Sequence, residues 1–314
     1  MSGTGERRVA ILLSTYNGAT YLADQLESLL GQSHDNWVLY WRDDGSADTT
    51  VEVVERFAAR AGQGRCVQLT QSGTHHGATR SFLSLLRAVA PTLAEGDAVA
   101  FADQDDVWLP DKIARGLAGL DSVAAHRPAV YCARQILVDA TLNRIGLSAW
   151  QPSGPTGFPA ALAQNVATGC TVMLNPAAAR LVASSRPAPA TLHDWWCYLL
   201  VTAAGGVLLR DAEPSVLYRQ HATNAVGAPI SVLRRGREAA RRGPAPFMTV
   251  LRQHVTALLG HGEMLTETAR SELDAIAAAL SGGWRTRLPM LALPGLRRQT
   301  LLETLVFRVW FLLG

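Results

Sequence analysis

Short apolar runs alternate with segments of helical hydrophobic spacing along the first part of the chain. The runs are continuous and end in polar or turn residues, which is typical of the buried strands of a parallel sheet. The segments between them repeat apolar residues every three or four positions and predict amphipathic helices. Asp48 is expected to cap the helix after the second strand, and Pro110 to open the helix after the fourth. The predicted strands are 9–13, 37–41, 66–69 and 98–102, and the predicted helices are 19–31, 49–60 and 78–90.

Polar clusters follow three of these strands directly, at 14–17, 43–46 and 103–106. The strand–helix order with short loops predicts a parallel, doubly wound α/β sheet. In such sheets ligands bind outside the carboxyl ends of the strands. We therefore expect one binding site that the three clusters form together.

The pattern changes at about residue 129. Further strands are predicted there around one helix, and from residue 228 the spacing is helical. Breaks in the helical pattern fall at Gly243-Pro244 and Gly282-Gly283. The additional predicted elements are the strands 130–138, 171–174, 207–209 and 216–218 and the helix 194–203.

Composition and charge separate two parts of the chain. With 48% hydrophobic and 18% charged residues, the 314-residue chain is globular rather than disordered. Residues 1–227 carry 17 basic and 20 acidic side chains, whereas residues 228–314 carry 12 and 6. A basic segment attracts nucleic acid or anionic lipid, or forms a solvated helical surface. Because the interleaved aromatic residues of nucleic-acid-binding surfaces are missing, no nucleic-acid partner is expected. We expect a domain over 1–227, with halves 1–128 and 129–227, and a helical extension over 228–314.

Cysteines and apolar stretches bear on where the protein works. The four cysteines are far apart and form no C-x-x-C pair, which predicts reduced core residues in a cytoplasmic protein and no zinc site. No stretch reaches the ~20 apolar residues that span a bilayer. The segment Leu301–Leu313 either lies on a membrane as an amphipathic helix or packs on the domain. The sequence is compatible with contact between the basic C-terminal helices and the inner face of the plasma membrane. It is also compatible with a homo-oligomer.

The acidic cluster Asp103-Gln104-Asp105-Asp106 carries the strongest local signal. Carboxylates at positions i and i+2 just past a buried strand suit a Mg²⁺ or Mn²⁺ ion that bridges a diphosphate. Crowded carboxylates repel each other unless a cation lies among them. One of the four residues could instead cap the following helix, but we favour the metal interpretation.

Three weaker signals lie at other strand or helix ends. Asp44 either belongs to a turn or accepts from a nucleobase N–H. Asp194 either caps a helix, or acts as a general base beside a sugar site walled by Trp195 and Trp196. His221 ends a predicted strand and is either structural or a further metal ligand, and Arg219 before it could face phosphate.

Taken together, the motifs resemble glycosyltransferase family 2. The matching pieces are ILLSTYNG, RDDGS, FADQDDVWLPDKI, NVATGCTVMLN, HDWW and LYRQH, in the order of the family and over residues 9 to about 225. The resemblance implies a GT-A fold, which is a Rossmann-like nucleotide-sugar-binding α/β domain with a mostly parallel central sheet, here followed by C-terminal helices. The motifs most resemble the rhamnosyltransferase-like branch, whose bacterial members build surface polysaccharides such as those of the cell wall.

The resemblance also implies residue roles. Asp103 and Asp105 would form the D-x-D pair on ribose and metal, with Asp105 as the more direct ligand and His221 as a further ligand. Asp194 would be the catalytic base, and Trp195 and Trp196 would contact the acceptor. One residue between Ser72 and Arg80 would contact the nucleobase of the donor, and the resemblance does not single out which residue it is. The donor would be lined by Thr15, Tyr16, Asn17, Asp44, Asp103, Gln104 and Gly169.

The predicted function is an inverting, metal-dependent transfer of a sugar to a hydroxyl of a glycan or lipid-linked acceptor. The branch resemblance implies dTDP-L-rhamnose as the donor, with a UDP- or GDP-sugar as the alternative. A nucleotidyltransferase of similar fold would place a Gly-rich basic loop after the first strand, and Ser14-Thr15-Tyr16-Asn17 lacks it. A catalytically inactive glycan- or nucleotide-binding module is the alternative of another class. Loss of the acidic residues would indicate it, and here all of them are present.

Overall fold

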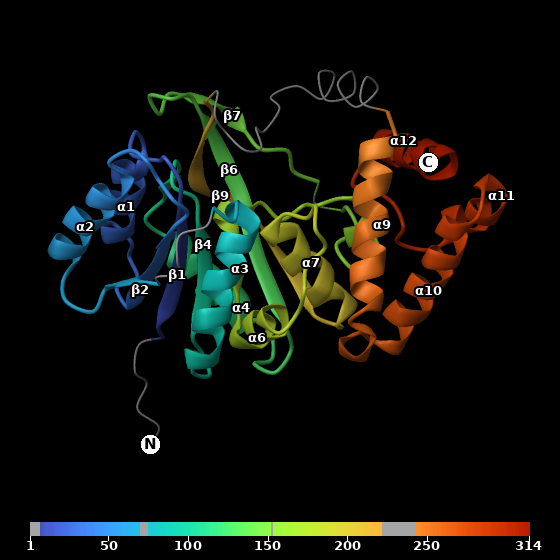
Figure 1. Ribbon diagram of the computed structural model, residues 1–314, viewed down its shortest axis with the longest axis horizontal. Coiled ribbons are helices and arrows are strands. Elements are labelled where there is room, and N and C mark those ends of the chain that lie inside the picture. Colours follow the sequence, from blue (N-terminus) through green and yellow to red (C-terminus); the bar gives the residue numbers. More distant parts are fainter. Residues whose placement is uncertain (1–6, 70–74, 152, 222–242) are drawn as a thin grey trace.

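The computed structural model describes residues 7–69, 75–151, 153–221 and 243–314 of the chain (Figure 1). Within these ranges the strands form a single sheet in the order β3-β2-β1-β4-β8-β6-β9-β5, and β7 pairs with β6. The strands are β1 (Val9–Thr15), β2 (Trp37–Asp43), β3 (Cys66–Gln68), β4 (Ala98–Ala102), β5 (Val107–Trp108), β6 (Ala129–Val138), β7 (Arg144–Leu147), β8 (Met173–Leu174) and β9 (Val207–Arg219).

The sheet is mostly parallel, as the strand–helix order predicts. β1 pairs in parallel with β2 and β4, β2 with β3, and β6 with β9. The short strand β8 runs antiparallel between β4 and β6 and joins the two halves of the sheet. The carboxyl ends of β1, β2 and β4 therefore lie side by side, which brings the three polar loops together.

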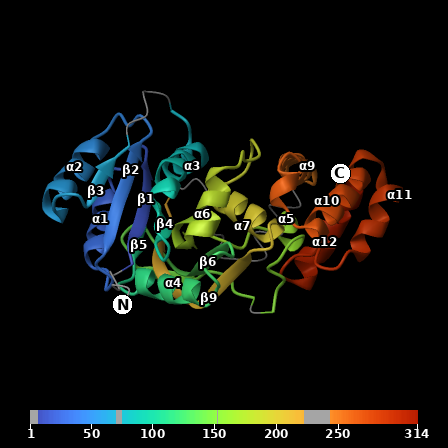
Figure 2. The same cartoon turned by 90° about the horizontal axis from the view of Figure 1, so that it is seen from below.

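Helices cover both faces of the sheet, because each strand presents apolar side chains to both sides. Along β1, Ala10 and Leu12 belong to one buried cluster and Val9, Ile11 and Leu13 to the other. The first cluster packs under α3, α6 and α7, and the second under α1, α2 and α4, as Figure 2 shows. The helices are α1 (Leu22–Leu30), α2 (Thr50–Ala61), α3 (Ala78–Val89), α4 (Lys112–Asp121), α5 (Ala160–Ala163), α6 (Pro176–Ala183) and α7 (His193–Ala203).

The C-terminal helices form a further layer beside α7, and the break predicted at Gly282-Gly283 is confirmed. The segment before the break predicted at Gly243-Pro244 lies outside the described residues. The C-terminal helices share the first buried cluster with the sheet domain through side chains such as Leu251, Leu273 and Phe307. The predicted boundary at 227/228 lies outside the described residues. No helix of the described ranges is both long and apolar enough to cross a bilayer. The helices are α9 (Ala245–Leu259), α10 (Glu267–Ser281), α11 (Trp284–Arg287) and α12 (Leu301–Leu313), with the 3-10 segment η4 (Leu288–Ala292).

Three details of the predicted elements are wrong or shifted. The two strands predicted at 207–209 and 216–218 are one bulged strand, β9, whose register against β6 shifts where Pro214 interrupts it. Pro110 precedes the helix instead of opening it, because Asp111 holds the N-cap of α4. Thr49 holds the N-cap of α2, and Asp48 accepts from the Thr50 N–H at 3.0 Å.

Candidate active site

The loop after β1 is clamped to the loop after β4. Gln104 accepts from the Tyr16 N–H at 2.8 Å and donates to the Tyr16 carbonyl at 3.0 Å, in the manner of a neighbouring strand. This approach needs a glycine at position 18, because a Cβ there would lie 2.3 Å from Gln104 Oε1. The Gln104 amide is thus used within the protein, so the direct donor contact predicted for it does not agree with its placement.

The loops after β1 and β2 are tied together in the same way. Thr15 is fully buried and its hydroxyl donates to Asp43 at 2.9 Å, so Thr15 supports the donor loop from below instead of lining it. Asn17 holds the left-handed backbone conformation and its side chain accepts from the Ala47 N–H at 2.8 Å. Tyr16, with 45% of its surface exposed, and Asn17 are the two exposed side chains among the nucleoside contacts predicted in this loop.

Asp44 is only 2% exposed, and its carboxylate is surrounded by donors. The backbone N–H groups of His76 and Gly77 donate to it at 2.7–3.0 Å, and Arg42 donates at 2.5 Å. Burial raises the pKa of Asp44, but these hydrogen bonds outweigh burial and hold it below its ordinary value. Asp44 therefore orders the chain at 75–77, and its carboxylate has little room for a nucleobase N–H.

His75 is the residue that this arrangement presents beside the nucleoside loop. Its ring lies 4.3 Å from the Tyr16 ring, and its Nδ1 lies 3.0 Å from the Asp44 carboxylate. The His75 side chain is 56% exposed. Of the described residues between Ser72 and Arg80, His75 best fits a contact with the nucleobase. The sequence predicted such a contact in this segment without singling out a residue.

Asp105 and His221 meet although 116 positions separate them, because β9 returns along the sheet to the end of β4. Asp105 Oδ2 lies 2.8 Å from His221 Nε2, and both side chains keep part of their surface open, 21% and 10% respectively. A carboxylate oxygen and an imidazole nitrogen at this separation suit a divalent cation such as Mn²⁺. The structure thus brings together two of the three residues predicted as metal ligands.

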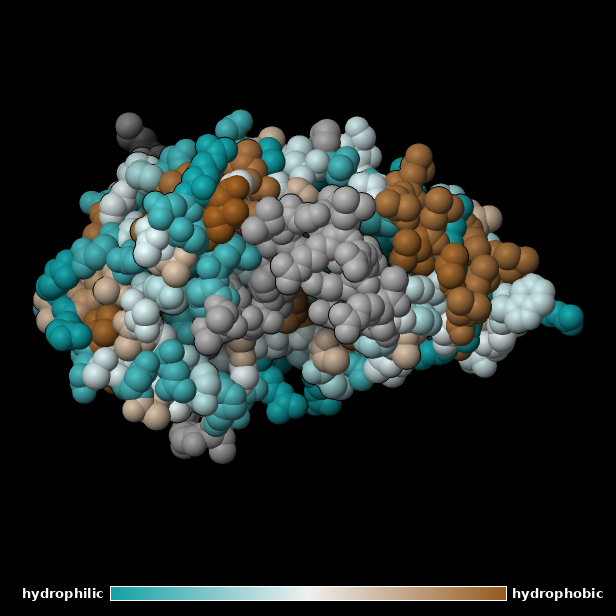
Figure 3. All heavy atoms as spheres, turned by 90° about the horizontal axis from the view of Figure 1, so that it is seen from above, coloured by the Kyte–Doolittle hydropathy of each residue, from teal (hydrophilic) through white to brown (hydrophobic). Residues whose placement is uncertain are grey.

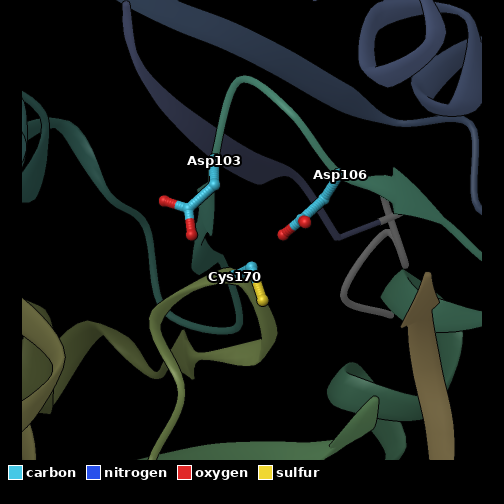
Figure 4. A group of neighbouring side chains, drawn as sticks. All are labelled: Asp103, Asp106 and Cys170. Atoms are coloured by element: carbon cyan, nitrogen blue, oxygen red, sulfur yellow. The ribbon is translucent and has the colours of Figure 1, made fainter. Parts of the chain in front are cut away.

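Asp103, the third, is partly exposed and belongs to one cluster with Asp106 and Cys170 (Figure 4). Ligand atoms of these three side chains all lie within 4.8 Å of one another. Burial and then the charges of Asp105 and Asp194 raise the pKa of Asp103 to about 7. Crowding of this kind is relieved by a positive charge, which is the physical argument for a cation at this edge of the sheet.

Asp106 and Cys170 form the floor of the cluster, a role that sequence reasoning missed. Asp106 is fully buried and accepts from the Arg219 N–H at 3.2 Å. Burial and the neighbouring carboxylates raise the pKa of Asp106, and burial and Asp106 raise that of the Cys170 thiol, which stays protonated. A protonated thiol is a poor ligand for Mg²⁺ or Mn²⁺, so Cys170 fits a supporting role in this cluster better than that of a ligand.

A buried lysine lies close to these residues. Lys112 is the only lysine among 29 basic residues, and its ammonium lies 3.7 Å above the Trp108 ring. Burial lowers the pKa of Lys112 to about 7, while Cys170, Asp106 and Asp103 act against that fall. A single lysine in an arginine-rich chain was the signal that could have identified it. A compact ammonium fits where a planar guanidinium does not.

Arg219 is buried and structural, so the phosphate contact considered for it is wrong. Its guanidinium donates to the Asp105 carbonyl at 2.9 Å and to Asp24 at 2.8 Å. It therefore fixes the backbone of the acidic loop from the side of β9.

Asp194 lies at the start of α7, 6% exposed, and near enough to Asp103 to raise its pKa. Burial raises the pKa of Asp194 to about 6, and donors from Trp195 N–H, Asn165 and Gly169 N–H limit the rise. The Trp195 N–H donates at 2.6 Å. These donors hold the carboxylate in a fixed orientation toward the Gly169 turn.

The two tryptophans after Asp194 point in different directions. Trp196 is fully buried and its Nε1 donates to Ser185 at 2.8 Å, so it fills the core and the acceptor contact predicted for it is wrong. Trp195 is half-buried, donates to the Ala161 carbonyl and packs edge-on against His254 of α9, with ring centroids 4.6 Å apart. Trp195 alone of the pair keeps surface beside Asp194.

Comparison with known proteins assigns the class that this fold and acidic edge define. Residues 10–170 match the family described as glycosyl transferase family 2, which is half of the chain. The chain belongs to this family and is a glycosyltransferase. Within this class it is similar to a dTDP-rhamnosyl transferase of Shigella flexneri, with 27% identity over 236 residues that cover 70% of this chain and 75% of the relative.

Two further similar proteins show how much of the chain the similarity covers. An Escherichia coli protein named as a UDP-Glc:α-D-GlcNAc-diphosphoundecaprenol β-1,3-glucosyltransferase is 30% identical over 105 residues, which cover 33% of this chain and 38% of that protein. The structure of S. aureus TarS 1-349 in complex with UDP-GlcNAc matches with a TM-score of 0.57 at 16% identity, covering 87% of this chain and 72% of that chain. The structural likeness supports the GT-A fold.

Proposed function

We propose that this glycosyltransferase inverts the anomeric configuration of the sugar it transfers, with Asp194 as the general base. Asp194 takes the proton of an acceptor hydroxyl, the hydroxyl oxygen bonds to the anomeric carbon, and the bond from that carbon to the nucleoside diphosphate breaks. A single displacement inverts the carbon and needs no covalent intermediate on the protein. The observation that carries the proposal is the fixed, buried Asp194 carboxylate beside the acidic edge.

A divalent cation fits the acidic edge, with Asp105 and His221 as the ligands and Asp103 behind them. Their carboxylate and imidazole atoms lie 2.8 Å apart and partly open, beside carboxylates whose mutual repulsion a cation relieves. Mg²⁺ or Mn²⁺ held there would neutralise the charge that builds on the departing diphosphate.

The donor we propose is dTDP-L-rhamnose, and the acceptor a hydroxyl of a polysaccharide or lipid-linked glycan. The similarity to a dTDP-rhamnosyl transferase over 70% of the chain supports the donor. The relative that acts on a diphosphoundecaprenol-linked sugar supports a lipid-linked acceptor and keeps a UDP-sugar as the second candidate donor. We place the enzyme in the cytoplasm, on the side of the membrane where nucleotide sugars are made.

Calorimetry with dTDP-rhamnose, UDP- and GDP-sugars, each with and without Mn²⁺, tests the donor. We expect Mn²⁺-dependent binding of dTDP-rhamnose, weakened in Asp105→Ala. Preference for a UDP- or GDP-sugar would replace the donor and keep the enzyme. No binding of any nucleotide by folded protein would favour an inactive module.

The base assignment is tested by Asp194→Asn. The amide keeps the size of the side chain but cannot take a proton, so we expect transfer to fall by about 10²–10⁴-fold while donor affinity stays within twofold. Full turnover by this variant would refute the assignment.

A further inference from the structure

The C-terminal helix α12 carries an apolar face that the described part of the protein leaves open. Phe307 and Phe311 are fully buried against the domain. Residues on the other side follow helical spacing and are all apolar, where a soluble helix normally carries polar side chains. They are Leu301 (82% exposed), Leu302 (65%), Leu305 (58%), Val309 (53%) and Leu313 (75%).

The open face continues onto the neighbouring segment. Trp284 of α11 and Leu288 of η4 are 57% and 50% exposed, and Arg287 between them donates to the Phe311 carbonyl at 3.3 Å, which ties α11 to α12. Figure 3 shows the apolar side chains gathered over the C-terminal helices. We call these seven exposed residues the leucine face. A contiguous exposed apolar patch of this kind marks an interaction surface.

Positive charge accompanies the leucine face. Residues 282–314 contain five Arg and a single acid, Glu303. Arg285 and Arg297 are exposed, whereas the Glu303 carboxylate accepts from the Thr300 hydroxyl at 3.0 Å in the helix cap. An apolar face in an arginine-rich segment complements a bilayer that contains anionic lipids.

The leucine face lies on the same side of the molecule as the active site. β1 starts near the N-terminus at the bottom of Figure 1 and ends toward the top, where α12 also lies. Figure 3 views the protein from that side and shows the apolar patch over the C-terminal helices. A surface on which α12 rests would therefore lie on the side of the molecule where the strands β1, β2 and β4 end.

We propose that α12 lies flat on an anionic membrane with the leucine face in the lipid, which presents the active site to an acceptor carried by a lipid. This rests on the proposed function for the acceptor, but not for the docking itself. With 13 residues α12 is about 20 Å long and lies on the bilayer without spanning it. A symmetric dimer through the same face would bring two arginine-rich segments together, which disfavours a second copy as the occupant.

Vesicle flotation of the full chain tests the proposal. We expect binding to vesicles of phosphatidylglycerol and phosphatidylethanolamine, at least tenfold weaker binding to phosphatidylcholine vesicles, and weakening by salt. The double variant Leu305→Glu/Val309→Glu should lose at least tenfold in vesicle binding. The matched control Leu30→Glu/Ile145→Glu changes exposed apolar residues of α1 and β7 by the same charge and should bind as the wild type.

A second measurement follows tryptophan fluorescence. Brominated lipid should quench the fluorescence of Trp284 in the vesicle-bound wild type, and Trp284→Phe should lose that part of the quenching. Equal binding by both double variants, or no binding by the wild type, would overturn the proposal. A dimer in light scattering that only Leu305→Glu/Val309→Glu dissociates, without vesicle binding, would assign the face to a second copy. Vesicle binding is measured without any glycosyl transfer. Its result therefore tests the membrane proposal independently of the proposed function.

Discussion

At the scale of single residues, the site depends on how each carboxylate is surrounded. Asp44 is buried under backbone N–H donors and has its pKa lowered, whereas Asp103 lies among other carboxylates and has its pKa raised to about 7. Asp194 lies between these extremes, because its donors partly offset its burial. One residue type thus serves as a loop anchor and, in the function proposed above, as a member of a cation site and as a base.

The pKa of about 6 for Asp194 predicts how activity depends on pH. A base works only in its deprotonated form, which dominates above the pKa and is lost as the pH falls through it. We expect kcat/KM to be level above about pH 7 and to fall about tenfold per pH unit below about pH 5.5. A pH–rate profile checks this, with donor binding measured at each pH to separate protonation of Asp103. A level profile down to pH 4.5 would contradict the base assignment.

The close packing around Gly169 predicts that a side chain at this position would displace the Asp194 carboxylate. A Cβ at this position would lie 2.9 Å from His193 Nε2 and 3.6 Å from Asp194 Oδ2. His193 is stacked on Phe82, with centroids 4.2 Å apart, and cannot move away easily. We therefore expect Gly169→Ala to lower kcat at least tenfold by displacing the carboxylate, with little change in nucleotide affinity.

The control for this variant is Gly157→Ala, since no atom lies within 4 Å of a Cβ placed there. It should keep the wild-type kcat. Equal kcat in Gly169→Ala and Gly157→Ala would show that the turn tolerates a side chain.

Sequence patterns identified which residue types matter, but not which way the side chains face. Asp105 and His221 meet as predicted, because motifs at strand ends fix both partners. Thr15 and Trp196 were expected to touch ligands and are buried, since a motif does not say which of two adjacent side chains turns inward. Lys112 could not be placed under the cluster without knowing how α4 packs.

At the scale of elements, strand ends and their loops act as one unit. The parallel sheet followed from buried runs such as Val9–Thr15, whose apolar residues face two layers. β9 was missed as one strand because Asp211 and Pro214 interrupt its pattern. Arg115 binds the Asp211 carboxylate and the Pro214 carbonyl at the bulge, a tertiary contact that local sequence does not reveal.

The clamp between the loops after β1 and β4 predicts that Gln104 acts on donor binding through Tyr16. Gln104→Ala removes two hydrogen bonds, at 2.8 and 3.0 Å, and frees the loop that carries Tyr16. We expect a five- to twentyfold rise in the Kd for the nucleotide, with kcat at saturating donor reduced less than threefold. Calorimetry and hydrogen exchange at the Tyr16 amide check this. Gln104→Glu keeps the acceptor for the Tyr16 N–H and should show a smaller effect. Unchanged exchange at Tyr16 in Gln104→Ala would show that the loop is held by other contacts.

At the scale of the whole molecule, the C-terminal helices are continuous with the catalytic core. Leu251 of α9 and Leu273 of α10 belong to the same buried cluster as Trp196 of α7. His254 of α9 bonds Thr191 at 2.8 Å and packs against Trp195, directly beside the proposed base. The sequence predicted the helices but no motif linked them to the site, because this contact depends on packing alone.

A shared core predicts that the two parts unfold together. Leu273 is fully buried, so Leu273→Ala should lower the free energy of unfolding by about 2–5 kcal/mol, whereas Leu301→Ala, at an 82% exposed position, should change it by less than about 0.5 kcal/mol. Scanning calorimetry should show a single unfolding transition for the wild type. Leu273→Ala should lower the temperature of the whole transition, and bound nucleotide should raise it. Two transitions, of which nucleotide raises only one, would mean that the helices fold independently. One transition would mean instead that α9 and α10 are part of the structure that holds Trp195 and Asp194 in place.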